Sequence, residues 1–231
     1  MIYLSGKFQY ATAYLIVCVC VLLTAGVQND ALAQAKAQSN VQSPAGTYKL
    51  DPSHASLVFS VNHLGFSNYT ASFSSFDATL EIDPSRPADA KLEATVEVSS
   101  LLLPAPPGGF LKQMLGRQWF NARRFANMTF ESIKIEKTGA STARVTGTLT
   151  LLGVSKPMAF NVTFNGGNAG VPGFTPRARI GFSAHGTLNR SDFGMTTSLP
   201  PDGSTRGVGD TVEFRIEAEF SGPSMAEAPP A

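Results

Sequence analysis

The sequence predicts an all-β domain of eight alternating strands that share one apolar face. Apolar and polar residues alternate with period two in eight separate runs, which puts the apolar side chains of each strand on one face. Gly, Pro and Asn/Asp clusters separate the runs, as at 83–87, 166–168 and 200–203. The aromatic residues are 16 Phe against 5 Tyr and 1 Trp, and Phe suits an apolar interior because it has no polar atom that needs a partner.

The first residues have the features of an export signal. Lys7 precedes an uncharged apolar run at 11–27, and Ala31-Leu32-Ala33 offers small residues for cleavage, so we expect a signal peptide over 1–33. An uncleaved membrane anchor is the alternative, although this run is at the short limit for a spanning helix. We expect a periplasmic protein with a flexible leader at 34–45 and no stable membrane insertion after cleavage.

Both cysteines, Cys18 and Cys20, lie within the predicted signal. The processed chain would therefore contain no disulfide, no cysteine nucleophile and no cysteine metal site. The 18 Lys+Arg residues are balanced by 17 Asp+Glu residues. This balance predicts no nucleic-acid partner, because such partners require a basic surface that neutralises phosphates.

The strands follow one another in a single domain at 46–220, and the last is the clearest because its apolar residues alternate with Glu and Arg. Between the third and fourth strands, the break Pro-Ala-Pro-Pro-Gly-Gly at 104–109 precedes apolar residues at helical spacing, which predict a short helix within 110–120 of a long crossover. A Pro/Ala-rich tail at 221–231 is expected to be disordered. The eight strands are predicted at 57–62, 76–82, 92–98, 129–137, 144–151, 158–164, 179–188 and 212–220.

The shared apolar face must be buried, and the pattern leaves two soluble solutions open. A closed barrel removes the sheet edges, whereas a sandwich buries the same faces between two sheets. An outer-membrane barrel would point its apolar face outward and carry girdles of Trp and Tyr. Because only Trp119, Tyr48 and Tyr69 remain after signal removal, the composition disfavours that third architecture.

Six strings, taken in order, resemble the YceI family of secreted lipid-binding proteins. They are YKLDPSHA at 48–55, VNHLG at 61–65, WFNARRF at 119–125, GTLTLLGVSKP at 147–157, NRSDFGM at 189–195 and VGDTV at 208–212. The resemblance implies an extended, lipocalin-like antiparallel barrel of eight strands with an elongated apolar cavity. It also implies a long isoprenoid ligand, such as a polyisoprenoid phosphate or an isoprenoid quinone. Many family members have a charged stretch where this chain has the break at 104–109, so nothing is carried over about the cavity mouth.

A long isoprenoid offers only apolar surface, so its burial needs apolar side chains rather than directional chemistry. The alternative for each lining candidate is that it fills a solid core. Met114 and Trp119 are candidates for a lid over the cavity. The candidate lining residues are Phe59, Val61, Phe76, Leu80, Val96, Phe160, Val162, Phe182, Phe214 and Ile216.

Three polar residues are candidates for contact with a lipid headgroup. His63 is in phase with Phe59 and Val61, so its imidazole could donate to a quinone carbonyl or a phosphate at one barrel end. Arg190 and Asp192 flank Ser191 before Phe193-Gly194. The structural alternatives are a satisfied histidine at position 63 and a salt-bridged or hydrogen-bonded corner at 190–192.

The sequence therefore predicts a lipid-binding and transport protein rather than an enzyme. No motif for a metal or a catalytic nucleophile is present, so we expect no catalytic cofactor, no metal and no catalytic residue. The bound group would be an isoprenoid lipid or quinone. The alternative function is a solidly packed barrel that acts as a protein-interaction or structural module in the cell envelope, and a homodimer is left open.

Overall fold

The computed structural model describes residues 43–171 and 173–224. All of the described residues belong to one compact unit. The predictions of a signal peptide at 1–33, of a leader up to residue 42, and of a tail from residue 225 lie outside the described residues.

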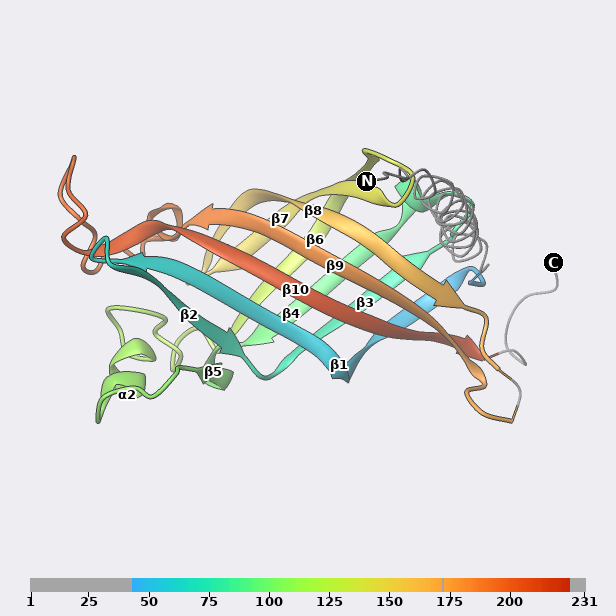
Figure 1. The fold of residues 1–231 in the computed structure, drawn as a ribbon, viewed down its shortest axis with the longest axis horizontal. Helices are drawn as coiled ribbons and strands as arrows, with labels where there is room; N and C mark the ends of the chain where they lie inside the picture. The colour runs from blue at the N-terminus through green and yellow to red at the C-terminus, as the bar shows by residue number, and fades with distance from the viewer. Residues whose placement is uncertain (1–42, 172, 225–231) are drawn as a thin grey trace, which may run out of the picture. The chain divides into compact units, whose positions relative to one another are not determined.

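Eight antiparallel strands close into a barrel, which confirms the predicted all-β fold and decides between barrel and sandwich (Figure 1). The ring runs β1-β3-β4-β6-β7-β8-β9-β10, and β10 pairs with β1 to close it. A short extension leaves the ring where β2 pairs with the second half of β1 and β5 pairs with β2. The strands are β1 (Gly46–His63), β2 (Ser67–Phe73), β3 (Phe76–Ile82), β4 (Lys91–Glu97), β5 (Leu101–Leu102), β6 (Asn127–Lys137), β7 (Thr142–Leu151), β8 (Val154–Asn168), β9 (Arg177–Asn189) and β10 (Val208–Ser224).

The alternation in the sequence sets the two faces of the ring. Along β10, Glu213, Arg215 and the following glutamates are exposed, while the apolar residues between them are half-buried or buried. In the register between β1 and β10, the pair that closes the barrel, apolar residues lie opposite apolar residues: Phe59 pairs with Phe214, and Leu57 pairs with Ile216. The apolar faces of neighbouring strands therefore meet inside the barrel.

A short helix lies in the crossover between β5 and β6, as predicted. The helix α2 (Phe110–Met114) begins at the expected residue but ends earlier than position 120. The chain folds back on itself after the helix: the Phe120 amide donates to the Met114 carbonyl at 3.0 Å, and Asn121 adopts a left-handed conformation with φ 46°. This reversal brings Trp119 and Phe120 into the core.

The predicted tail is wrong for its first four residues, because β10 continues through Ser221–Ser224. Ser221 pairs with Lys49 and Arg179, and Ser224 pairs with Arg177. Gly222 is buried under the Tyr48 ring, where a Cβ atom would lie 2.1 Å from Tyr48 Cε1. These contacts hold the segment in the sheet although its sequence has no alternating pattern.

The connections gather at two ends of the barrel (Figure 1). The β1–β2, β7–β8 and β9–β10 connections and the 103–126 crossover lie at what we term the crossover end. The β3–β4, β6–β7 and β8–β9 connections lie at the opposite, distal end. In the described part of the chain, no helix has the length and hydropathy needed to cross a membrane.

Each end holds its own buried cluster. The distal cluster consists of Tyr48, Leu50, Ala78, Leu80, Ala178, Ile180, Ala218 and Phe220. The crossover-end cluster consists of Ala71, Phe73, Val98, Leu101, Trp119, Phe120, Phe130, Val145, Leu149, Leu151, Phe160, Ala184, Phe193 and Met195.

Candidate functional site

The middle of the barrel lies between the two buried clusters. Leu92 and Ala94 on β4 and Ile216 on β10 pack against both clusters, so they mark the midsection. These side chains face inward yet are only half-buried, and so are Val96 and Phe214 on the same strands. An inward-facing side chain that keeps accessible surface borders space that protein atoms do not fill. The midsection is therefore an apolar interior that is incompletely packed.

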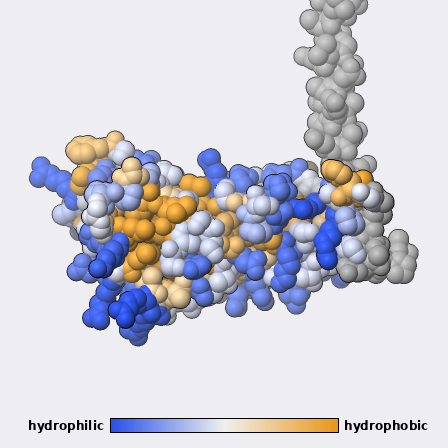
Figure 2. All heavy atoms as spheres, turned by 90° about the horizontal axis from the view of Figure 1, so that it is seen from below, coloured by the Kyte–Doolittle hydropathy of each residue, from blue (hydrophilic) through white to orange (hydrophobic). Residues whose placement is uncertain are grey.

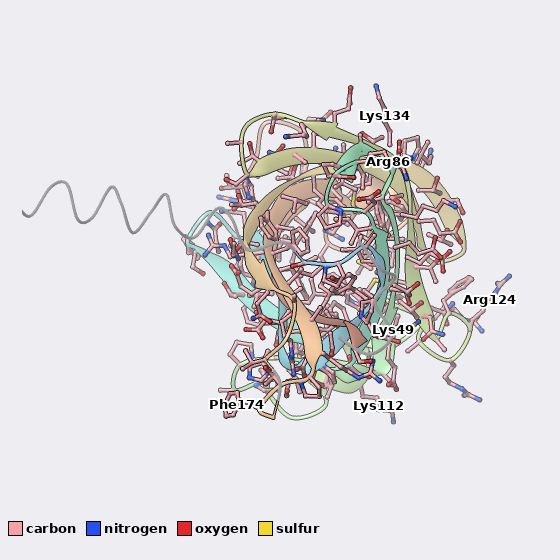
Figure 3. All side chains as sticks on the ribbon, turned by 90° about the vertical axis from the view of Figure 1, so that its right-hand side faces the viewer. Lys49, Arg86, Lys112, Arg124, Lys134 and Phe174 are labelled. Atoms are coloured by element: carbon pink, nitrogen blue, oxygen red, sulfur yellow. The ribbon has the colours of Figure 1, made fainter. Side chains whose placement is uncertain are left out.

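Seen from the distal end, the strands form a ring around this interior (Figure 3). Arg86 and Lys134 point away from the barrel on its outer side in this view. Both side chains are largely exposed, and each takes part in an exposed ion pair, Arg86 with Asp83 and Lys134 with Glu136. Arg190 is the exception among the described residues, because no other charged side chain there is buried, so the remaining charges leave the apolar side chains to line the inside.

Phenylalanine rings and two glycines shape the inner wall near the crossover end. The Phe160 ring lies 5.2 Å from the Phe130 ring and 6.0 Å from the Phe214 ring, measured between centroids. Gly186 on β9 lies beneath two of them, since a Cβ atom there would be 2.7 Å from Phe214 Cζ and 2.8 Å from Phe160 Cβ. A Cβ atom at Gly147 on β7 would lie 2.3 Å from Phe130 Cζ. The phenylalanine side chains therefore occupy the space that a side chain at either glycine would need.

The structure brings most of the predicted lining residues to this interior. At the crossover end, Trp119 and Phe160 are buried, and Phe59, Val96, Met114, Val162 and Phe214 are half-buried against them. At the distal end, Leu80 is buried, and Phe76 and Phe182 pack against the distal cluster. Ile216 joins the two groups, whereas Val61 is half-buried opposite Val212 and Tyr69 and belongs to neither cluster.

Sequence reasoning missed several inner residues. Leu92 and Ala94 share the face of Val96 on β4, so the same alternation could have nominated them. For Phe73 and Phe120 the sequence pattern predicts an inward orientation only weakly, because β2 is short and Phe120 lies in an irregular crossover. Their rings meet edge to face at 5.7 Å and link the crossover to the barrel wall.

Arg190 is the one charged side chain that is buried within the described residues. It lies in the 3-10 turn η4 (Arg190–Phe193), which follows β9 at the crossover end. Its Nε donates to the Gly209 carbonyl, its Nη1 to the carbonyls of Met195 and Thr197, and its Nη2 to the Val208 carbonyl, all at 2.8–2.9 Å. These bonds describe a hydrogen-bonded corner, which was the structural alternative for this residue.

Trp119 carries an unpaired donor beside Arg190. The Arg190 guanidinium lies 5.4 Å from the centroid of the Trp119 ring, within the range of a cation–π contact. The Trp119 indole Nε1 is buried and has no hydrogen-bond partner in the described structure. Burial lowers the pKa of Arg190, and the nearby Asp210 carboxylate opposes that shift. The crossover end therefore combines a buried cation with a buried, unsatisfied N–H group.

The other two headgroup candidates are exposed. His63 lies at the end of β1, opposite Val208 and Ser67, and Asp192 lies within η4. Asp192 borders a hollow of about 210 Å³ between β8, β9 and η4. A second hollow of about 440 Å³ lies at the distal rim, between Lys49, Arg177 and Pro223. None of the predicted lining residues borders either hollow, although Met158, Leu188 and Phe193 at the first hollow also contact the crossover-end cluster.

Among the described polar groups outside the interior, one trio has the residue types of a catalytic triad but not its geometry. Asp51, Ser53 and His54 are in mutual contact, but the same His54 Nδ1 lies 3.0 Å from the Ser53 hydroxyl and 3.2 Å from the Asp51 carboxylate. A histidine that relays a proton uses its two different ring nitrogens for these partners, so this exposed trio does not have the geometry of a triad. Among the described residues, no group of three His, Cys, Asp or Glu side chains is placed to hold a metal ion.

These features define a class of protein: a closed antiparallel barrel with an apolar, incompletely packed interior and a capped end. The chain belongs to the YceI family, because the model of the YceI-like domain matches residues 48–220. The UPF0312 protein of Pseudomonas fluorescens (strain SBW25) is 34% identical over 153 residues, which are 65% of this chain and 77% of that protein. The UPF0312 protein of Yersinia pestis (strain Pestoides F) is 34% identical over 160 residues, which are 68% and 80% of the two chains.

Solved structures have the same fold. The YCEI protein of Campylobacter jejuni is 30% identical, with a TM-score of 0.58 over 69% of this chain and 88% of that one. Burkholderia cenocepacia BcnA is 24% identical, with a TM-score of 0.63 over 74% of this chain and 98% of that one. A polyisoprenoid binding domain from Saccharophagus degradans is 13% identical, with a TM-score of 0.55 over 76% of this chain and 98% of that one. At these last two identities, the likeness concerns the fold alone.

Proposed function

We propose that this protein binds one long isoprenoid-type lipid inside the barrel and carries or stores it in the periplasm without chemical change. The observation that carries the proposal is the incomplete packing of an interior lined by apolar side chains, with Phe214 and Ile216 half-buried in its middle. Burying apolar ligand surface there contributes about 25 cal/mol per Å². The Saccharophagus degradans domain with the same fold is described as a polyisoprenoid binding domain, which supports the choice of ligand class.

The shape of the interior favours a long, thin ligand. β8 contains 15 residues and β10 contains 17, so each strand extends roughly 50 Å at about 3.3 Å per residue. The inner face is apolar from Met158 to Phe164 on β8 and from Val212 to Phe220 on β10, so an extended chain of repeated isoprene units meets similar contacts along these runs. A short amphiphile would leave part of this surface uncovered.

We further propose that the polar end of the lipid lies at the crossover end. The Trp119 Nε1–H is a buried donor without an acceptor, a state that costs about 1–3 kcal/mol. A quinone carbonyl or a phosphate oxygen would supply that acceptor, and the adjacent Arg190 guanidinium would favour a negative or polarised oxygen. Because four of the N–H groups of Arg190 are already bonded to carbonyls, its role toward the headgroup is mainly electrostatic.

A titration followed through Trp119 tests this proposal, because it is the single tryptophan of the chain. Lipid-stripped protein is mixed with an isoprenoid quinone and, separately, with a hydrocarbon of equal length that has no carbonyl. We expect saturable quenching by the quinone, and roughly tenfold weaker quinone binding in Trp119→Phe, measured by competition. The hydrocarbon should bind both proteins equally. Failure of the wild-type protein to bind either ligand would contradict the proposed function.

A further inference from the structure

The segment that caps the crossover end carries an unusual charge distribution. Between Val98 and Phe130 the chain has four cations, Lys112, Arg117, Arg123 and Arg124, and no Asp or Glu. The chain as a whole is nearly balanced, with a net charge of +1. The 190–207 connection at the same end adds exposed Asp192 and Asp202 but also exposed Arg206, so the cations remain in excess there.

These four cations are available to an external partner. All four side chains are exposed, and the ion pairs found among the described residues involve none of them. The Arg124 guanidinium lies 5.2 Å from the centroid of the adjacent Phe125 ring. Lys112 and Arg124 both point away from the barrel in the end-on view (Figure 3). The fold therefore does not neutralise this charge internally.

Apolar side chains are exposed in the same region. Leu102 on β5 is 54% exposed, and Leu111 on α2 is 37% exposed. Figure 2 shows a hydrophobic area on the half of the barrel that carries β2, β5 and α2, with hydrophilic side chains around it. The other side of the same crossover buries Trp119 and Phe120 in the crossover-end cluster. The same crossover thus buries two aromatic side chains in the core and exposes a leucine and cations on its surface.

We propose that the exposed surface at this end, which carries Leu102, Leu111, Lys112, Arg117, Arg123 and Arg124 and which we term the docking face, docks on the surface of an anionic phospholipid bilayer. Cations contribute attraction to anionic lipid, and exposed leucines contribute by entering the headgroup region. A bilayer fits better than an acidic protein because the lipid of the proposed function, on which this inference rests, would enter or leave there. Docking places the capped end of the barrel against the membrane.

Vesicle sedimentation tests the docking face. The protein is mixed with vesicles of phosphatidylcholine alone or with about 30% phosphatidylglycerol. We expect binding to the anionic vesicles only, and its loss in high salt. The combined variant Arg117→Gln, Arg123→Gln and Arg124→Gln should bind roughly a hundredfold more weakly, since each basic residue near the surface contributes about 1 kcal/mol. The single variant Lys112→Glu should weaken binding to anionic vesicles at least tenfold. It replaces the triple variant in this test if the triple variant does not fold.

The matched control removes the same charge elsewhere. The control is the combined variant Lys134→Gln, Lys137→Gln and Arg144→Gln, whose residues are exposed on the β6–β7 hairpin. It should bind anionic vesicles as strongly as the wild-type protein does. Equal losses in the two triple variants would overturn the docking face, and so would wild-type binding to neutral vesicles as strong as to anionic ones. All variants are produced and exported in the same host, so that any processing of residues 1–33 is the same in every comparison.

The lipid content of each variant separates this inference from the proposed function. We expect the Arg117, Arg123 and Arg124 variant to retain extracted lipid while it loses vesicle binding, because these side chains lie outside the interior. A wild-type protein that carries lipid but binds no vesicle would overturn the docking face alone. A wild-type protein that binds anionic vesicles but neither carries nor takes up lipid would contradict the proposed function instead.

Discussion

Arg190 shows how one residue can organise the capped end of the barrel. Its guanidinium reaches two carbonyls at the start of β10 and two in the 195–197 loop, and it stacks on Trp119 from the crossover. Nearby, the Ser191 amide and hydroxyl both donate to Asp210, at 2.8 and 2.6 Å. One planar side chain thus connects the 195–197 loop and the start of β10, and it links both to Trp119 in the distant crossover.

Arg190→Met should therefore destabilise the fold by roughly 3 kcal/mol or more, because it leaves buried carbonyls without donors. Arg190→Lys should recover only part of this loss, since an ammonium cannot reproduce the geometry of the guanidinium. Denaturant unfolding at constant m-value measures both effects. A loss below about 1 kcal/mol in Arg190→Met would show that the hydrogen-bonded corner contributes little.

Asp51 predicts a pH dependence of stability. The Ser53 hydroxyl and the Arg179 guanidinium both donate to its carboxylate, and these bonds hold the pKa of Asp51 well below its ordinary value. A carboxyl whose pKa is depressed in the folded state stabilises the fold above its unfolded pKa, near 4, and loses that contribution as the pH falls through the folded pKa. Acid should therefore destabilise the protein partly through Asp51.

The free energy of unfolding should be lower in Asp51→Asn than in the wild-type protein at neutral pH, and the difference should shrink as the pH falls below about 4. Asp202→Asn, at an exposed carboxylate, serves as the control and should show no such convergence. A difference between Asp51→Asn and wild type that stays constant down to the lowest accessible pH would contradict the assignment.

At the scale of the elements, two glycines on β9 differ in the space around them, because one lies against phenylalanine side chains and the other does not. Gly186 faces inward beneath Phe160 and Phe214, whereas Gly181 on the same strand has no heavy atom closer than Asn165 Cβ, at 4.0 Å from an added Cβ. The two glycines therefore have different roles, although both interrupt the alternation. Gly186 makes room for the inner wall, and the space around Gly181 would accept a side chain.

Gly186→Ala should destabilise the protein by about 1–3 kcal/mol, because the added methyl group forces the rings of Phe160 and Phe214 to move. Gly181→Ala should be close to neutral and is the matched control. Thermal unfolding of the two variants measures the difference. Equal stability of the two variants would show that the rings near Gly186 are not tightly placed.

The regular strands of this fold could be predicted from the sequence, because alternation fixes a face wherever a strand has one side in the barrel. β10, β7 and β4 follow that rule closely. On β6, Ile133 is 73% exposed because a register shift between Ser132 and Lys134 turns it outward. The alternation of apolar and polar residues contains no signal for this bulge, because the bulge arises from the pairing of β6 with β7.

Elements that depend on tertiary contacts were missed or misplaced. β2 has only Tyr69, Ala71 and Phe73 on its inner face, and β5 has two residues, so neither carries a long periodic signal. The first half of β1 was not predicted, because the Asp51–His54 segment interrupts it and shifts its register against β10. α2 is shorter than its spacing indicates, because the following residues turn back to bury Trp119.

For the whole molecule, the incomplete packing of the interior is the property that links fold to function. The alternation of apolar and polar residues predicts which face of each strand points inward. The predicted lining residues contact the two buried clusters, except for Val61. The alternation could not show which inner residues would be buried and which half-buried, since that depends on how the ends are closed. The crossover, the corner at Arg190 and the distal cluster close the ends, and the midsection between them is incompletely packed.

Substitutions on β8 test that the interior holds the ligand. Phe160→Glu and Val162→Gln place polar groups on the inner face, and both should abolish or strongly reduce lipid retention, because the ligand would leave these groups without hydrogen-bond partners. Thr163→Gln changes the opposite face of the same strand and should retain lipid. Unchanged lipid content in a folded Val162→Gln protein would refute the placement of the ligand along β8.

The most direct test of the account is organic-solvent extraction of the purified protein, followed by mass spectrometry of the extract. We expect one class of long isoprenoid-type lipid, present at close to one molecule per protein molecule, and its return when stripped protein is offered an isoprenoid quinone. Extracts without lipid from several expression hosts, together with no uptake of added isoprenoid quinone, would contradict the claim that the barrel is a lipid-binding protein.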